Sequence, residues 1–244
     1  MSGHSHAKTI KHQKTITDQK RGQIFSKMAR LISVATREGG ADPEINSKLR
    51  LVIEMAKKWN MPKDNIERAI KKGTGELTGE KLEEITFEAY GPGGIAIIIE
   101  GITDNKNRAL GEIKQILSQN NGKLVEEGSV KWLFERRGCI ILRITNQSEY
   151  TNKEDLEMLV IEAGAENIYW HNDLLDVYTK IEDLEKVKKD LEAQGIKIES
   201  ASLDWVAKEE IKTDEKTKES CQKLFEALDE SDSVQEIYSN IKLP

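Results

Sequence analysis

The chain has 244 residues, of which 37% are hydrophobic and 33% are charged, and its formal net charge is −6. This length fits one to three domains of about 50–200 residues. Because the apolar residues are plentiful and recur periodically, the composition excludes a disordered chain, and no apolar run approaches the ~20 residues of a membrane-spanning helix. The N-terminus lacks the apolar segment of a signal peptide, so we expect a cytoplasmic protein with no membrane partner.

The charge is unevenly distributed along the chain. Residues 1–75 contain 16 Lys/Arg and 7 Asp/Glu, a net charge of +9, whereas the remaining residues carry −15. A basic head on an acidic body indicates an end that binds a polyanion. Nucleic acid is favoured over membrane lipid, because the basic stretch lacks the wide apolar face of an interfacial helix.

The N-terminal third reads as a basic arm followed by helices. Residues 1–17 have only scattered apolar residues and no acidic ones, which predicts a flexible arm. Residues 18–78 predict a basic helical domain with three amphipathic helices. The first runs from Asp18 to Gly39-Gly40, and the second begins with Asp42 as its N-cap and Pro43 at its first position. The third is short and stops at Gly73-Thr74-Gly75.

Beyond Gly79 strands alternate with helices. Residues 85–90 and 94–103 read as strands joined at Gly91-Pro92-Gly93, and an amphipathic helix follows that ends at Asn121-Gly122. Residues 124–136 read as a further strand.

Residues 139–204 follow the order β-α-β-β-α-β, which predicts a ferredoxin-like module. The helix and strand left over in residues 213–244 would complete the unfinished sheet of residues 80–136. The sequence therefore predicts an α+β protein with a small helical bundle and two ferredoxin-like modules, the second inserted in the first. The predicted domains of the body are residues 80–136 plus 213–244, which form a discontinuous domain, and the inserted residues 139–204.

The cations of the arm and the helices are the strongest functional signal. Residues 1–37 contain one acid, Asp18, whereas solvated faces usually mix both signs. Few polar residues are spaced like those of a recognition helix, so we expect contacts to the phosphate backbone more than to bases. The candidate nucleic-acid-binding residues are Lys8, Lys11, Lys14, Lys20, Arg21, Lys27, Arg30, Arg37, Lys57, Lys58, Lys63, Arg68, Lys71 and Lys72.

Two loops are weaker candidates for phosphate or ribosome contact. The turn between the first two strands could present the backbone N–H groups of Gly91 and Gly93, but a tight hairpin connection explains it better. Thr103–Arg108 lies at a strand end and a helix start, where Asn105, Lys106, Asn107 and Arg108 could bind an anion. The alternative is that Asp104 caps the helix and Asn105 makes the turn, and the two roles can coexist.

No signature of an enzyme, a metal site or a cofactor site is found. Nucleophile elbows, Walker loops and paired-His metal motifs are missing, so we expect no catalysis, no cofactor and no small-molecule substrate. His4, His6 and His12 have no Cys or carboxylate cluster beside them to support a zinc site. With Met1 removed, the Ser2-Gly3-His4 terminus could hold Cu(II) or Ni(II) in vitro, which we interpret as incidental. Cys139 and Cys221 fall on apolar patterns and are predicted to be reduced core thiols.

Several motifs resemble those of the YebC/PmpR family, in the same order along the whole chain. They include Arg21–Lys27, Asn60–Ile70, Tyr90–Gly94, Thr103–Arg108 and Gly128–Trp132. The resemblance implies a three-domain protein with a helical head and two α+β modules. It also implies a nucleic-acid partner, because members are described as DNA-binding transcriptional regulators or as translational activators at the ribosome.

We therefore expect a non-enzymatic regulator of gene expression, monomeric, that binds nucleic acid through its basic head. Transcriptional regulation by DNA binding is the first hypothesis. A ribosome-associated translation factor that binds ribosomal RNA, including relief of stalls at proline runs, is the second. A protein-binding adaptor is the third.

Overall fold

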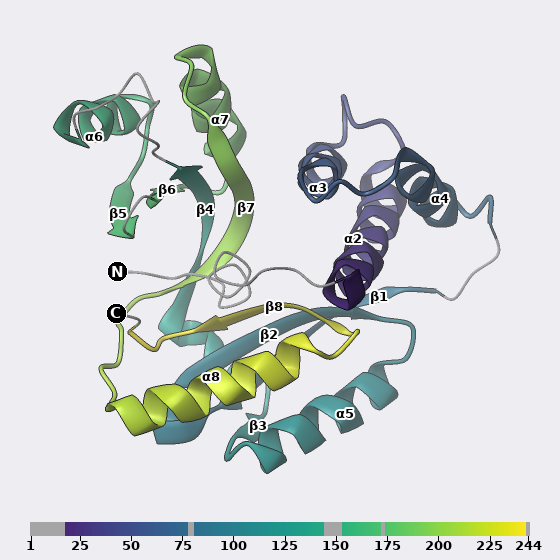
Figure 1. Cartoon of the computed structure of the whole chain (residues 1–244), viewed down its shortest axis with the longest axis vertical. Helices are drawn as coiled ribbons and strands as arrows, with labels where there is room; N and C mark the ends of the chain where they lie inside the picture. Colours follow the sequence, from purple (N-terminus) through teal and green to yellow (C-terminus); the bar gives the residue numbers. More distant parts are fainter. Residues whose placement is uncertain (1–17, 78–80, 144–152, 172–173, 243–244) are drawn as a thin grey trace.

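The computed structural model describes residues 18–77, 81–143, 153–171 and 174–242. These residues form a helical head and two four-stranded antiparallel sheets (Figure 1). Their α+β fold confirms the predicted fold class. The predicted arm lies outside the described residues.

The head consists of three helices, α2 (Asp18–Gly39), α3 (Ser47–Lys58) and α4 (Lys63–Thr74). Each is amphipathic, and their apolar stripes bury one another. The shared core includes Ile24, Met28, Ile32, Leu49, Val52, Ala56, Ile66 and Ala69. α4 continues through Gly73 and ends at Gly75, which takes the left-handed conformation at φ +81°. A Cβ on Gly73 would lie 2.5 Å from the Ser33 carbonyl oxygen of α2, so only glycine permits this close helix contact.

The predicted start of the second helix at Asp42-Pro43 is wrong. α3 begins at Ser47 with Asn46 as its N-cap, whose Oδ1 accepts a hydrogen bond from the N–H of Leu49 at 3.0 Å. The Asn46 amide also donates to the carbonyl oxygens of Ala35 and Gly40, at 2.8 Å each. Asn46 is the better cap because its buried amide joins the end of α2 to the start of α3, whereas Asp42 is exposed and only closes a turn.

The first sheet has the strand order β3-β1-β2-β8. Its strands are β1 (Glu83–Tyr90), β2 (Ala96–Thr103), β3 (Lys123–Val125) and β8 (Val234–Ser239). Helices α5 (Lys106–Gln119) and α8 (Glu215–Asp229) cover one face, as Figure 1 shows. β8 pairs antiparallel with β2, so the C-terminal segment completes the sheet that the N-terminal strands begin, as predicted.

The second sheet has the strand order β5-β6-β4-β7. Its strands are β4 (Phe134–Arg143), β5 (Asn167–His171), β6 (Leu174–Thr179) and β7 (Ile198–Ala207). The connecting helices, α6 (Lys153–Glu162) and α7 (Leu184–Ala193), pack on one face. The chain order and the antiparallel pairing are those of a ferredoxin-like unit, in agreement with the prediction.

The predicted single strand over residues 124–136 is wrong. β3 ends at Val125, and a loop and the short 3₁₀ turn η2 (Lys131–Leu133) separate it from β4. The loop leaves the sheet because the buried carboxylate of Glu88 takes up its backbone N–H groups, those of Gly128, Val130 and Lys131, at 2.6–2.9 Å.

β4 then runs without interruption from Phe134 through the predicted boundary at residues 136–139, paired with β7. Phe134 and Ala207, at one end of this pair, pack with Ala96, Ile98 and Tyr238 on the second face of the first sheet. The two sheets are therefore joined by a shared apolar cluster. The domain boundaries themselves stay a prediction.

Candidate nucleic-acid interface

The outer face of α4 carries an uncompensated set of cations. Ile66 and Ala69 turn inward to the head core, so Arg68, Lys71 and Lys72 point to solvent on the opposite side. None of these three side chains forms a hydrogen bond or an ion pair with any residue that the structure describes. We call Arg68, Lys71 and Lys72 the outer-face cations. Because no carboxylate is paired with them, they are available to an external anion.

Lys63 lies at the start of the same helix and is also accessible. Its side chain is 87% exposed, and its ammonium lies 3.5 Å from the Glu67 carboxylate one turn later. Such a solvated pair is weak, so it does not withdraw Lys63 from a competing phosphate.

Other cations of the head face the body, against the expectation that they cover a free surface. Lys27 is 5% exposed, and its ammonium lies 2.8 Å from the Asp229 carboxylate and 2.7 Å from the Asp229 carbonyl oxygen, on α8. Arg30 donates to the carbonyl oxygens of Ile102 and Asp232. The predicted phosphate contact of Lys27 is therefore incompatible with its burial. The physical reason is that α2 has two packed faces, one against the head core and one against the first sheet.

The remaining predicted cations fall between these cases. Arg37 is exposed and donates to the carbonyl oxygen of Leu82. Arg21 is exposed at the start of α2. Lys20 lies in α2, but its side chain is outside the described set, as are Lys8, Lys11 and Lys14 entirely.

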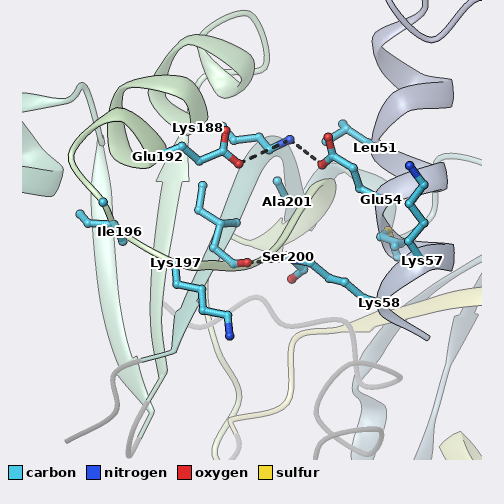
Figure 2. Close-up of a pocket in the computed structure, with 13 residues that line it drawn as sticks. Leu51, Glu54, Lys57, Lys58, Lys188, Glu192, Ile196, Lys197, Ser200 and Ala201 are labelled. Atoms are coloured by element: carbon cyan, nitrogen blue, oxygen red, sulfur yellow. Dashed lines mark hydrogen bonds and ion pairs between the residues drawn. The ribbon is translucent and has the colours of Figure 1, made fainter. Parts of the chain in front are cut away.

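A cleft of about 460 Å³ separates α3 from α7 and the start of β7 (Figure 2). Lys58 of α3 crosses it and donates to the carbonyl oxygens of Ile198, at 2.8 Å, and Glu199. Burial lowers the pKa of Lys58 from its ordinary value of 10.5. From the other wall Lys188, 5% exposed, reaches Glu54 of α3 at 2.6 Å. Lys188 therefore joins the head to the body.

The loop before α5 is a capped helix start. Asn105 is the N-cap, and its Oδ1 accepts from the N–H of Arg108 at 3.0 Å. Asp104 does not cap the helix but forms an ion pair with the Arg108 guanidinium. Lys106 and Asn107 are exposed. Since Asp104 offsets Arg108, this loop offers less positive charge than the outer face of α4.

The Gly91–Gly94 turn is a tight connection between β1 and β2. The N–H of Gly91 donates to Ile95 at 2.9 Å and that of Gly94 to Gly91 at 3.0 Å. Gly93 has φ +70°, and a Cβ there would lie 2.6 Å from the Thr217 methyl group of α8. These contacts support the interpretation as a hairpin turn held against α8, in which the N–H of Gly91, one of the two predicted donors, is already used.

The structure also reveals a residue that pattern analysis missed. Glu88 is 3% exposed, and its three backbone N–H donors lower its pKa below the ordinary 4.5 although burial opposes this. The loop that it holds carries Trp132, which is 63% exposed and whose Nε1 donates to the Ser129 carbonyl oxygen. The only signal in the sequence was the position of this glutamate between Phe87 and Ala89, two apolar residues of a predicted strand.

The thiols agree with the prediction, since Cys139 and Cys221 are buried and form no disulfide. Burial raises the pKa of Cys221 to about 11. Within the described ranges, no three His, Cys, Asp or Glu side chains gather in a way that could hold a metal ion. Within the same ranges, no helix is long and apolar enough to span a membrane.

Comparison with known proteins follows the division seen in the fold. Residues 5–76 match a family model described as the TACO1/YebC protein N-terminal domain, and residues 82–241 match the TACO1/YebC second and third domain. The chain belongs to the TACO1/YebC family. The family resemblance drawn from the motifs is thereby confirmed.

Relatives from bacteria match the chain over its whole length. A protein of Halothermothrix orenii named "Probable transcriptional regulatory protein" is 49% identical and covers 100% of this chain and 96% of that protein. One with the same name from Prosthecochloris aestuarii is 45% identical over 99% of this chain and 96% of that protein. The crystal structure of a conserved hypothetical protein from Aquifex aeolicus has a TM-score of 0.87 at 43% identity, with 96% of each chain covered.

Proposed function

We propose that this protein is a non-enzymatic transcriptional regulator that binds DNA through the outer face of its helical head. The observation that carries the proposal is that Arg68, Lys71 and Lys72 are exposed and unpaired on a head joined to an acidic body. The names of the bacterial relatives support the regulatory role.

Binding is driven by the phosphate backbone. Each cation that neutralises a phosphate releases condensed counterions, so affinity arises from charge and decreases with salt. The exposed side chains of α4 are mostly Lys, Arg, Asp and Glu, and Asn65, which is partly exposed, is the one amide side chain of this helix that could read an adenine edge. Recognition therefore rests on backbone position and nucleic-acid shape. The acidic body repels phosphates and so orients the head toward the nucleic acid.

The same feature favours structured RNA as a second candidate ligand. A surface that contacts phosphates without reading bases fits an RNA helix as well as a DNA duplex, because RNA duplexes are recognised mainly by shape and backbone. A ribosome-associated translation factor is therefore the alternative function.

The test is a comparison of affinities for ligands of different class. Binding of the full-length protein to duplex DNA of several sequences, to an RNA hairpin and to ribosomes is measured between 50 and 200 mM salt. Tight binding to one DNA sequence supports transcriptional regulation, and ribosome binding that survives the higher salt supports the alternative.

If the three outer-face cations and Lys63 contact phosphates, log K decreases with log salt at a slope of about −3 to −4 for duplex DNA. A body variant, Lys223→Gln on exposed α8 surface, is the matched control and should bind like the wild type. Failure to bind any of these ligands at 50 mM salt would contradict the proposal.

A further inference from the structure

The cleft between head and inserted module holds more positive charge than its structural contacts use. Four lysines line it, against two glutamates, Glu54 and Glu192. Lys58 is engaged in a hydrogen bond that joins α3 to β7. Lys188 is engaged in an ion pair that joins α7 to α3. Lys57 and Lys197 are exposed, and their side chains have no hydrogen-bonding or ionic partner among the described residues.

These two free lysines stand on opposite walls. Lys57 lies near the end of α3, in the head, and Lys197 lies in the segment between α7 and β7, in the otherwise acidic body (Figure 2). The carboxylates of the lining do not balance them, because Lys188 lies 2.6 Å from Glu54 and 4.0 Å from Glu192. Their ammonium groups point in opposite directions in Figure 2, that of Lys57 up along α3 and that of Lys197 down, so an extended anion could meet one unpaired cation at each end of the cleft.

The cleft also has apolar lining. Leu51 and Met55 of α3 face Ile196, Ile198 and Ala201, of which the last three are less than 9% exposed. Cations beside an apolar floor suit a ligand that has phosphates and flat, weakly polar faces together. Nucleotides have both, whereas inorganic phosphate or an acidic peptide uses only the charge.

The width of the cleft selects among nucleic acids. A single lysine side chain, Lys58, spans the walls, and Lys188 bridges them a second time. A volume of about 460 Å³ falls in the range of small-ligand sites, about 300–1,000 Å³. A duplex is too wide to enter between walls held this close, but an unpaired strand or an extruded nucleotide is not.

We propose that this cleft binds an unpaired nucleic-acid strand, with Lys57 and Lys197 contacting different phosphates of the strand and the apolar floor contacting the bases. The inference rests on the proposed function and refines it, since the outer face of α4 holds a helix or duplex while the cleft holds a neighbouring single strand. It predicts a preference for nucleic acid that carries a junction between paired and unpaired regions.

The experiment uses the full chain, a 12-nucleotide oligo(U), an oligo(dT) of equal length and a blunt duplex. The double variant Lys57→Gln/Lys197→Gln should bind both single strands at least 5-fold more weakly, and its salt slope for them should be shallower by about 1.4. Duplex affinity should change by less than 2-fold. Since neither side chain forms a hydrogen bond or an ion pair with a described residue, the unfolding midpoint should match that of the wild type.

Two controls separate the outcomes. The outer-face variant Arg68→Gln/Lys71→Gln/Lys72→Gln should weaken duplex binding, and Lys223→Gln should weaken nothing. If the double variant binds single strands like the wild type while the outer-face variant loses duplex affinity, the cleft inference is overturned and the proposed function stands. If the wild type binds neither ligand, the proposed function is overturned first. Equal competition by polyglutamate would also overturn the inference, because it would show that charge alone suffices.

Discussion

Lys27 and Lys71 both belong to the three-helix head. In the sequence, both fall outside the helical spacing of the apolar core residues. The structure gives them opposite surroundings, since Lys27 is buried against Asp229 of α8 whereas Lys71 is exposed without a partner. Cations that face the body join the head to it, and cations that face solvent remain available for a ligand. Net charge of a segment thus overstates its binding surface, because part of that charge is neutralised within the fold.

Carboxylates of the body divide in the same way. Glu88 is buried and holds a loop through three backbone N–H groups, whereas Glu215 and Glu219 of α8 face solvent. The inward groups should therefore control stability, and the outward groups should control association. The following variants test that division.

The largest effect on stability is expected for Lys27→Met. The substitution keeps an unbranched apolar side chain but leaves the Asp229 carboxylate without its cation, so the free energy of unfolding should decrease by about 2–3 kcal/mol. Urea unfolding at pH 7 measures this loss, with Lys223→Met as the exposed control. A loss below about 0.5 kcal/mol would mean that the inward cations do not stabilise the head against the body.

A slightly smaller loss, about 2 kcal/mol, is expected for Glu88→Gln, because an amide accepts fewer hydrogen bonds than a carboxylate and has lost its charge. The pKa of Glu88 is lowered in the folded state, so its contribution is present above the unfolded pKa, near 4.5, and is lost as pH falls through the folded value.

Acid titration of the free energy of unfolding checks this pH dependence. The difference between wild type and Glu88→Gln should be constant above about pH 5 and shrink below pH 4.5. A difference that does not change between pH 7 and pH 3 would contradict the role given to the carboxylate charge.

Asn46→Ala should cost about 1–2 kcal/mol, because α3 loses its N-cap and two carbonyl oxygens of the α2 end lose a donor. Asn46→Asp restores the capping oxygen without the amide and separates the two contributions. Thermal unfolding of both variants measures them, and equal stability of Asn46→Ala and wild type would contradict the stabilising role given to the Asn46 cap.

The smallest effect on stability is expected for the outer-face variant Arg68→Gln/Lys71→Gln/Lys72→Gln. These side chains are exposed and form no hydrogen bond or ion pair with a described residue, and surface substitutions of this kind usually stay within about 0.5 kcal/mol. Its urea midpoint should equal that of the wild type. A clear decrease in the midpoint would show that these cations stabilise the fold, and it would contradict the distinction drawn between them and Lys27.

Local patterns in the sequence suffice for most of the architecture. Helical spacing of apolar residues finds the three helices of the head, and the β-α-β-β-α-β order finds the inserted module. The pairing of β8 with β2 is predicted because the last helix and strand of the chain are left over once the inserted module is assigned. These features depend on neighbours in sequence, which a periodic pattern encodes.

Contacts between distant residues are the part that the pattern does not contain. Lys27 and Asp229 are 202 residues apart in the sequence. Glu88, in β1, likewise bonds a loop that begins 40 residues later, at Gly128. Each looks like an ordinary charged residue in its own segment. The same limit explains the wrong N-cap at Asp42, since Asn46 is preferred for its bonds to Ala35 and Gly40.

The salt dependence of duplex DNA binding, compared between the wild type and the outer-face variant, tests the central claim most directly. The account predicts that the slope of log K against log salt becomes shallower by about 2–3 in the variant, with at least a 10-fold loss of affinity at 100 mM salt and unchanged stability. An identical slope and affinity in the two proteins would contradict it, because the exposed cations of α4 would then not contact the nucleic acid.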